Sequence, residues 1–339
     1  MTRKPVRVGV AGLGRSGWSI HALAIEAHPS FQLVAVTDPE PERRREATER
    51  FGCRAYDTYE GLVCDPDVEL VVVATPSHLH APMSCAALSA GKHVLVEKPM
   101  ALNVGEADAM LSCACQSGKV LTVFQIRRLD PDFLKIQEIL RSNVLGPIHA
   151  IRMAVYGYDR RRDWQTLTKF GGGQLNNTGS HFVDQALMLA GGEWRQLFVD
   201  MRRVAYAGDA EDHVKLVFKG RGGVVVDIEM GVSAFSLPHW LIMGKYGSLL
   251  GDGNRLEWKY YDPASLAEPK VSEGPVEGRR YGSGESIPWI TKSAEIPSTD
   301  TTPLFYDRLY RSLRQGAPLL VPPGEIRNLV ALFEACRAG

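Results

Sequence analysis

Short apolar runs that alternate with helix-like stretches fill the first third of the chain, and this alternation restricts the possible folds more than any other feature. The runs cover residues 6–11, 32–37, 68–75, 93–97 and 120–124. Strands that alternate with helices form a parallel sheet with right-handed crossover connections. Residues 1–124 are therefore expected to form an α/β domain built on a doubly wound parallel sheet.

The rest of the chain has a different pattern. Strand candidates follow one another with only short turns between several of them, at residues 148–156, 197–206, 214–218, 224–232, 241–246 and 256–261. Short turns favour antiparallel hairpins, so residues 125–339 are expected to form a second, α+β domain. Residues 263–300 lack periodicity and are interpreted as a surface excursion or a lid candidate. Two helices are predicted to follow, at residues 303–315 with Thr302 as N-cap, and from 323 to about 337.

Charge and composition exclude several kinds of partner. The chain has 39 basic and 39 acidic residues, so no global field attracts nucleic acid or an anionic membrane. No apolar targeting segment precedes the first strand and no stretch has the apolar length of a membrane span, which predicts a cytoplasmic protein. The six cysteines lack the paired spacing of a zinc site, and no metal is expected.

The segment between the first strand and the first helix has the spacing of a dinucleotide-binding turn. Gly12, Gly14 and Gly17 form a G-x-G-x-x-G pattern that also contains Arg15 and Ser16. Glycines there allow a tight turn and a close approach of the backbone to a pyrophosphate, while the helix N-terminus offers free N–H groups to the anion. The alternative is a glycine-rich turn in another kind of doubly wound protein.

Asp38 ends the second strand, where an acidic side chain can contact the ribose of the cofactor. Its carboxylate accepts hydrogen bonds from ribose hydroxyls and repels a 2′-phosphate, so NAD is preferred to NADP. Arg43, Arg44 and Arg45 follow on a predicted helix and could turn toward a phosphate. We interpret them instead as a solvated helix face that neighbouring glutamates balance.

Two further strand ends bring polar residues to the same edge of the sheet. Glu97 and Lys98 close one buried strand, and Thr75 and Pro76 close another, just ahead of His80. Open parallel sheets bind ligands at this edge, and burial can lower the pKa of a lysine enough to make it an acid or base. The structural alternatives are a lysine paired with a carboxylate and a histidine that packs at the start of a helix.

A glycine run at residues 171–173 leads into a helix that carries Asn177, His181 and Asp184. Their spacing places the three side chains on one face, opposite an apolar face. A histidine flanked by an amide and a carboxylate is a candidate for proton transfer. Trp164, which precedes the glycine run, could wall a ligand pocket or anchor a charged loop.

Together these motifs resemble the Gfo/Idh/MocA oxidoreductase family, which includes inositol dehydrogenase and glucose-fructose oxidoreductase. The resemblance extends over nearly the whole chain and rests on the glycine motif, the T-P dipeptide, the E-K-P triplet and residues 171–184. It implies a Rossmann domain followed by a domain with a large, mainly antiparallel sheet. It also implies a pocket for a sugar-like or cyclitol-like substrate and a homodimer or homotetramer.

The resemblance also implies roles for single residues. Lys98 and His181 match catalytic positions of the family, where such residues handle the hydroxyl proton while hydride passes between a substrate carbon and the nicotinamide. The family often has aspartate where this chain has Asn177, and an amide does not stabilise a charged imidazole as a carboxylate does. Lys98 is therefore expected to be the principal acid or base, with His181 as its partner. Asn177 and Trp164 are expected to contact the substrate, and Asp184 is a further catalytic candidate that could share the proton.

The expected function is NAD-dependent hydride transfer to or from a secondary alcohol of a sugar, sugar acid or cyclitol. Two alternatives stay open. One is a redox-neutral lyase or hydrolase that keeps its NAD bound, and the other is a non-catalytic regulator that senses NAD.

Overall fold

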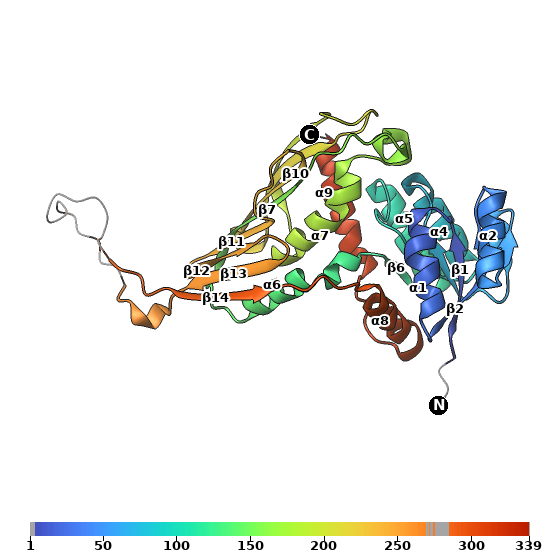
Figure 1. Ribbon diagram of the computed structural model, residues 1–339, viewed down its shortest axis with the longest axis horizontal. Helices are drawn as coiled ribbons and strands as arrows, with labels where there is room; N and C mark the ends of the chain where they lie inside the picture. Colours follow the sequence, from blue (N-terminus) through green and yellow to red (C-terminus); the bar gives the residue numbers. More distant parts are fainter. Residues whose placement is uncertain (1–3, 269–270, 272–273, 275–284, 339) are drawn as a thin grey trace.

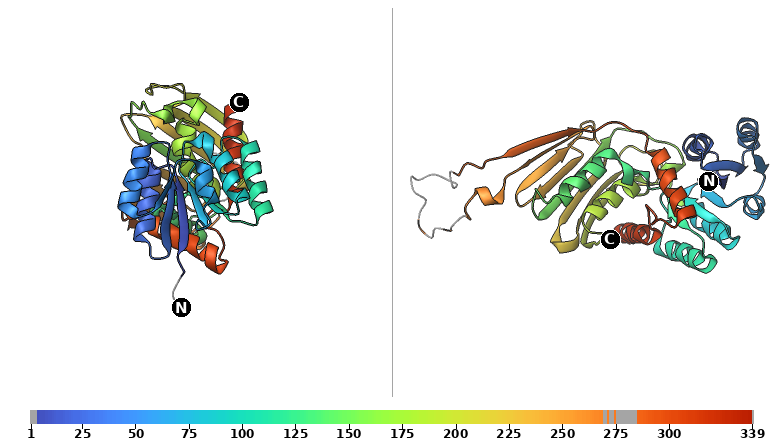
Figure 2. Two further views of the ribbon diagram at one scale, coloured as in Figure 1. Left: turned by 90° about the vertical axis from the view of Figure 1, so that its right-hand side faces the viewer. Right: turned by 90° about the horizontal axis from the view of Figure 1, so that it is seen from below.

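The structure is a computed structural model that describes residues 4–268, 271, 274 and 285–338. Within these residues the chain forms one sheet of six strands and one of eight. The two sheets lie at opposite ends of the molecule, with the C-terminal helices between them (Figure 1, Figure 2). The expected Rossmann domain and the α+β domain with a mainly antiparallel sheet are both confirmed.

The first sheet is parallel throughout and has the strand order β3-β2-β1-β4-β5-β6. Its strands are β1 (Val6–Ala11), β2 (Phe31–Thr37), β3 (Arg54–Tyr56), β4 (Leu70–Val73), β5 (His93–Val96) and β6 (Leu121–Val123). Strand β3 was not predicted, because it is a short edge strand with mostly exposed residues and lacks an apolar run. The other five coincide with the predicted runs to within two residues.

Helices connect these strands on both faces of the sheet. They are the π-helical segment η1 (Ser16–Ala22) continued by α1 (Leu23–Ala27), then α2 (Pro41–Phe51), α3 (Tyr59–Cys64), α4 (His80–Ser89) and α5 (Val104–Ser117). Helix α5 begins with a side-chain cap, because the Asn103 side chain accepts a hydrogen bond from the backbone N–H of Glu106. It ends at Gly118, which adopts the left-handed conformation at φ 63°.

The second sheet has the order β14-β13-β12-β11-β7-β10-β9-β8 and is antiparallel except for the parallel pair β7 and β10. Its strands are β7 (Ile148–Gly157), β8 (Arg195–Arg202), β9 (His213–Lys219), β10 (Val225–Val232), β11 (Trp240–Gly244), β12 (Gly247–Gly251), β13 (Arg255–Tyr260) and β14 (Ile290–Glu295). Helices α6 (Pro131–Arg141), α7 (Ser180–Leu189) and α9 (Pro323–Ala338) bury their apolar residues against one face of this sheet.

Two sequence-based expectations for the second domain were wrong. The segment 263–300 was expected to be a surface excursion, yet β14 lies within it and pairs with β13 along the edge of the sheet. Its residues 269–270, 272–273 and 275–284 lie outside the described residues. Helix α8 (Thr302–Gln315) includes Thr302, and its N-cap is the preceding residue, Thr301. The described helices include none that is both long and apolar enough to cross a membrane.

The last two helices tie the domains together. Phe305, Tyr306 and Leu309 of α8 are buried in the core of the first sheet, although they lie far along the chain from it. Helix α9 divides its apolar residues between both cores: Ile326 belongs to the first and Phe333 to the second. The strand ends of the first sheet and helix α7 of the second domain are therefore held in one packed unit.

Candidate active site

Lys98 is the second residue after β5 and reaches across to the second domain. Its ammonium group donates hydrogen bonds to the backbone oxygen and to the side-chain Oδ1 of Asn177, each at 3.1 Å. Asn177 belongs to the π-helical segment η6 (Leu175–Gly179), which leads into α7. The structure thus brings the lysine of the E-K-P triplet and the helix after the glycine run to a single point, 79 residues apart in the sequence.

The environment of Lys98 favours loss of its proton. The pKa of Lys98 is lowered to about 8, chiefly by burial and also by the positive charges of Arg15, Arg127 and Arg161, while the carboxylate of Glu97 opposes the shift. Asn177 offers two oxygen acceptors but no negative charge. Lys98 can therefore give or take a proton near neutral pH, which a solvated lysine does poorly.

His181 lies one turn beyond Asn177, and its protonation is defined by its neighbours. The Gln125 side-chain amide donates to the backbone oxygen of Ser180, so its Oε1 faces His181 Nδ1 at 3.0 Å as an acceptor. Nδ1 therefore carries the ring proton and Nε2 keeps a lone pair. Burial, aided by the charges of Lys98 and Arg127, lowers the pKa of His181 well below its ordinary value, so the ring is neutral.

Gln125 was missed at the level of sequence, although a signal for it exists. It follows β6, so it lies at the same carboxyl edge of the sheet as the residues that follow β4 and β5. Open parallel sheets bind ligands at the carboxyl ends of their strands, and this argument, which indicated Lys98, applies equally to Gln125.

Asp184 occupies a different environment from the one expected of a proton-sharing residue. Its two carboxylate oxygens accept hydrogen bonds from Nε and Nη2 of Arg128, both at 2.7 Å, and Arg128 Nη1 also binds Glu325 of α9 at 2.6 Å. Burial raises the pKa of Asp184, and the adjacent guanidinium opposes that rise. The hydrogen bonds found for Asp184 in the described part of the chain thus hold α7 in place.

The glycine turn has the shape that a dinucleotide requires. Gly12 has φ +90°, and a Cβ there would lie 2.6 Å from the backbone oxygen of Ala74, while a Cβ on Gly17 would lie 1.7 Å from the oxygen of Gly12. A Cβ on Gly14 would meet open space. Beside the turn, the buried Oγ1 of Thr75 has no hydrogen-bond partner among the described residues. A close-approach turn with an unsatisfied hydroxyl fits a bound pyrophosphate-containing cofactor.

Asp38 links this turn to the end of β2. Its Oδ2 accepts a hydrogen bond from the backbone N–H of Leu13 at 2.7 Å, and its Oδ1 accepts one from the backbone N–H of Glu40 at 2.9 Å. The interpretation of the arginine run as a solvated face holds for Arg45, which pairs with glutamates of its own helix. It fails for Arg44, whose side chain is mostly buried and donates from Nη1 to the backbone oxygen of Asp38 at 2.7 Å, and for Arg43, whose Nη1 lies 3.5 Å from Asp38 Oδ2. The edge expected to bind the ribose therefore carries both charges.

Glu97 and His80, two residues at the edge of the sheet expected to bind the cofactor, have partners within the protein. Glu97 is buried, accepts the backbone N–H of Lys98 at 3.0 Å and lies 3.2 Å from His21 Nε2. The ring of His80 is buried between the backbone oxygens of Pro99 and Thr75, at 2.6 and 2.9 Å. Both side chains therefore brace the strand ends, as the packing alternative for the histidine proposed.

The remaining predicted residues lie around this centre. Arg15 and Ser16 open the helix after the glycine turn, and Pro76 directly precedes the short helix at residues 77–79. Trp164 begins a single helical turn whose next residue, Gln165, lies with its Nε2 3.4 Å from Asn177 Oδ1. The turn that carries Trp164 therefore adjoins the site.

Comparison with known protein families agrees with this architecture. Residues 6–125 match the model described as "Oxidoreductase family, NAD-binding Rossmann fold", and residues 133–250 match the GFO/IDH/MocA C-terminal domain. The chain belongs to the GFO/IDH/MocA oxidoreductase family, as the sequence motifs indicated.

Named relatives and solved structures point the same way. The chain is 28% identical to scyllo-inositol 2-dehydrogenase (NADP(+)) of Bacillus subtilis, over 97% of this chain and 92% of that protein. It is 29% identical to myo-inositol 2-dehydrogenase of Thermotoga maritima, over 74% of this chain and 76% of that protein. A solved NAD-binding protein from Listeria innocua is 26% identical, with a TM-score of 0.82 over 99% of this chain and 96% of that one.

We expect Asn177→Asp to make Lys98 a weaker acid. The new carboxylate would stabilise the ammonium and raise the pKa of Lys98 from about 8 by about 1 to 3 pH units. The pH dependence of Lys98 acetylation by acetic anhydride, followed by mass spectrometry, measures this directly. Acetylation of the surface residue Lys135 in the same sample is the control, and an unchanged Lys98 profile would contradict the assignment.

We expect Asp184→Ala to destabilise the fold strongly. The side chains of Arg128 and Asp184 are only 3% and 4% exposed, and breaking a buried pair costs about 3–5 kcal/mol because one charge stays buried without a partner. Glu26→Ala, which removes an exposed pair with Arg50, should cost less than about 1 kcal/mol. Urea unfolding compares the two variants, and equal losses would refute the role given to Asp184.

Proposed function

We propose that the protein is an NAD-dependent dehydrogenase acting on a secondary alcohol of a sugar, sugar acid or cyclitol. The observation that supports this most is the Lys98–Asn177 contact beside His181, reached from two domains and close to a glycine turn that fits a dinucleotide. The two inositol dehydrogenases among the relatives support the substrate class.

The residues divide the work of proton transfer. NAD, when bound, takes up or gives back the hydride at its nicotinamide ring. In the oxidation direction, the neutral amine of Lys98 accepts the hydroxyl proton. The lone pair on His181 Nε2 accepts a hydrogen bond from the same or the adjacent hydroxyl, and Gln125 holds the ring in that tautomer. Asn177 positions the lysine through both of its oxygens.

Lys98→Ala tests this assignment. Loss of a general base typically lowers turnover by about 10² to 10⁴, so NADH formation from an accepted substrate should fall by that factor. A panel of cyclitols, sugars and sugar acids, followed at the absorbance of NADH, identifies the substrate first. Lys135→Ala, a change on an exposed helix face, should leave turnover intact, and NAD affinity should be similar in both variants. Full turnover in Lys98→Ala would refute the role.

The preference for NAD over NADP rests on Asp38, whereas Arg43 beside it and the NADP-dependent relative favour the phosphate. Asp38→Asn keeps an oxygen for the Leu13 N–H but removes the charge that repels a 2′-phosphate. We expect the ratio of kcat/KM for NADP to that for NAD to rise by roughly tenfold or more, since like charges in contact cost several kcal/mol. Adding Arg43→Ala should reverse part of the gain. A ratio that does not rise would show that Asp38 is not the discriminating residue.

The two alternative functions give different signals in the same assay. A redox-neutral lyase or hydrolase converts its substrate without net NADH. A sensor binds NAD without turnover of any substrate in the panel. The paired acid–base groups Lys98 and His181 favour catalysis over sensing.

Self-association is a further part of the proposal. The face of the second sheet opposite the helices carries Phe198 on β8 and Leu250 on β12, which are 57% and 45% exposed. Burial of such residues in a homodimer or homotetramer is favourable. Light scattering measures the mass, which should be two or four times 37.3 kDa. A cytoplasmic location stays a prediction.

A further inference from the structure

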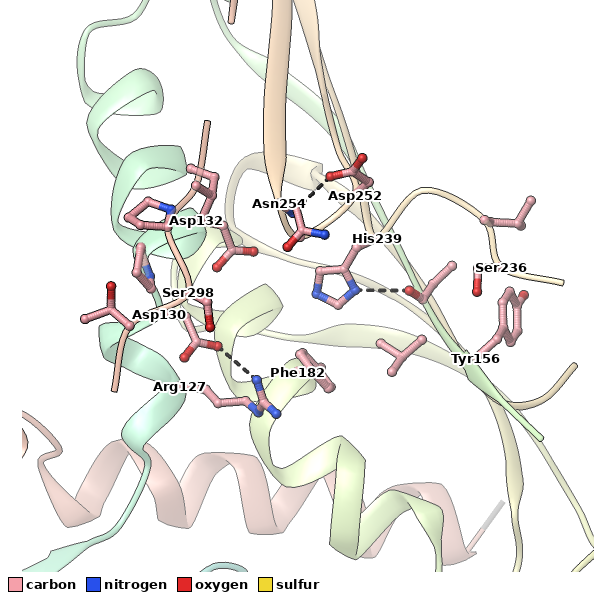
Figure 3. Close-up of a pocket in the computed structure, with 18 residues that line it drawn as sticks. Arg127, Asp130, Asp132, Tyr156, Phe182, Ser236, His239, Asp252, Asn254 and Ser298 are labelled. Atoms are coloured by element: carbon pink, nitrogen blue, oxygen red, sulfur yellow. Dashed lines mark hydrogen bonds and ion pairs between the residues drawn. The ribbon is translucent and has the colours of Figure 1, made fainter. Parts of the chain in front are cut away.

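A cavity of about 470 Å³ opens beside the candidate active site, at the end of the second sheet (Figure 3). Its walls come from the start of α6, from α7, from the end of β7, from the segment between β10 and β11, from the turn between β12 and β13 and from residues 296–299 after β14. The residues that matter for its chemistry are Arg127, Asp130, Asp132, Phe182, His239 and Asn254. Ligand pockets have volumes of about 300 to 1,000 Å³, so the cavity is large enough for a ligand of its own.

The cavity begins where the site around Lys98 ends. Phe182 lines it and directly follows His181 on α7. Arg127 lines it as well, two residues after Gln125, with its guanidinium 5.0 Å from the centre of the Phe182 ring. The backbone oxygen of Arg127 accepts a hydrogen bond from Gln185 of α7 at 2.6 Å, which fixes this shared wall. The charge of Arg127 also acts on Lys98 and on His181, so the cavity adjoins the candidate active site.

The charges of the lining disfavour an anionic ligand. The lining contains three carboxylates, those of Asp130, Asp132 and Asp252, and the guanidinium of Arg127. This guanidinium already pairs with Asp130 at 3.2 Å. Burial lowers the pKa of His239, so this ring adds no positive charge. A carboxylate or phosphate would meet a net negative surface with no unpaired cation to bind it.

Besides the hydroxyl groups of Tyr156, Ser236, Ser298 and Thr299, which can both donate and accept, the lining carries hydrogen-bond acceptors. His239 Nδ1 donates to the backbone oxygen of Ala154 at 3.1 Å, which leaves Nε2 as an acceptor on the side of the ring that faces the cavity (Figure 3). Asp132 and the amide of Asn254 add oxygens from the opposite walls (Figure 3). An acceptor-rich cavity matches a ligand that carries several hydroxyl donors.

We propose that this cavity binds a second, uncharged sugar ring linked to the ring on which Lys98 acts, so that the substrate is a glycoside or disaccharide. The inference rests on the proposed dehydrogenase function and narrows its substrate class. The cavity lining does not include Lys98, Asn177 or His181, the residues assigned to the reacting ring. A second ring linked to the first would occupy it.

Calorimetry on the NAD-bound protein tests the proposal with three ligands that share one accepted ring: the ring alone, the ring with a neutral glucosyl extension, and the ring with an anionic glucuronosyl extension. The neutral extension should increase affinity at least tenfold, and the anionic extension should not. Equal affinity for the single and extended rings, or tighter binding of the anionic ligand, would overturn the proposal.

Asn254→Trp fills the cavity from a surface turn and should reduce the affinity ratio of the neutral disaccharide to the single ring to about one. His239→Leu, which removes the Nε2 acceptor from another wall, should lower the same ratio and replaces the first variant if that one misfolds. Lys259→Trp is the control on an exposed position of β13, and its ratio should match that of the unmodified protein. A ratio unchanged in both cavity variants would count against the site.

The two proposals fail in different ways. If the single ring is oxidised by NAD but an extension changes nothing, the cavity proposal is wrong and the dehydrogenase proposal stands. If a disaccharide binds in a manner sensitive to Asn254→Trp but no ring is oxidised, the cavity binds the second ring and the dehydrogenase proposal is wrong.

Discussion

Helix α9 belongs to two hydrophobic cores at once, and the geometry of the candidate site depends on this. Lys98 is carried by a strand end of the first sheet, whereas Asn177 and His181 are carried by a helix that packs on the second. The hydrogen bonds between Lys98 and Asn177 require the domains to be held as one body. Ile326 near the start of α9 is buried in the first core and Phe333, two turns further along, in the second, and Glu325 adds an ion pair with Arg128.

Charge at the site is kept low by pairing a lysine with an amide. Where a carboxylate would hold the lysine as an ammonium, Asn177 supplies only dipoles, and burial then weakens the hold of Lys98 on its proton. His181 is neutral for the same reason. Glu97, the buried carboxylate whose charge acts on Lys98, is turned toward His21 and the backbone. Lys98 can therefore either give or take a proton near neutral pH.

Strands and turns that depend on a local sequence pattern could be predicted, whereas contacts that depend on packing between distant parts of the chain could not. The apolar runs of β1, β2, β4, β5 and β6 and the glycine turn are local, and they predicted the first domain and its binding edge. Strand β14 has exposed residues and pairs only at the sheet edge, so its short sequence resembles a loop. Helical spacing placed Asp184 on the same face as His181, but only the fold brings Arg128 to it. The contact between Arg43 and Asp38 depends in the same way on how α2 turns over the strand end.

Both segments that face the proposed ligands, η1 and η6, are π-helical. The direction in which their side chains point therefore depends on the number of residues in each turn. A π-helical turn contains one residue more than an α-helical turn, and each α-helical residue advances the chain by about 100°. Loss of one residue from Leu175–Gly179 would therefore rotate everything before it, relative to α7, by about that angle. This wide turn therefore sets the position of Asn177, which binds Lys98, relative to His181 on α7, and a shorter turn would present a different residue to the lysine.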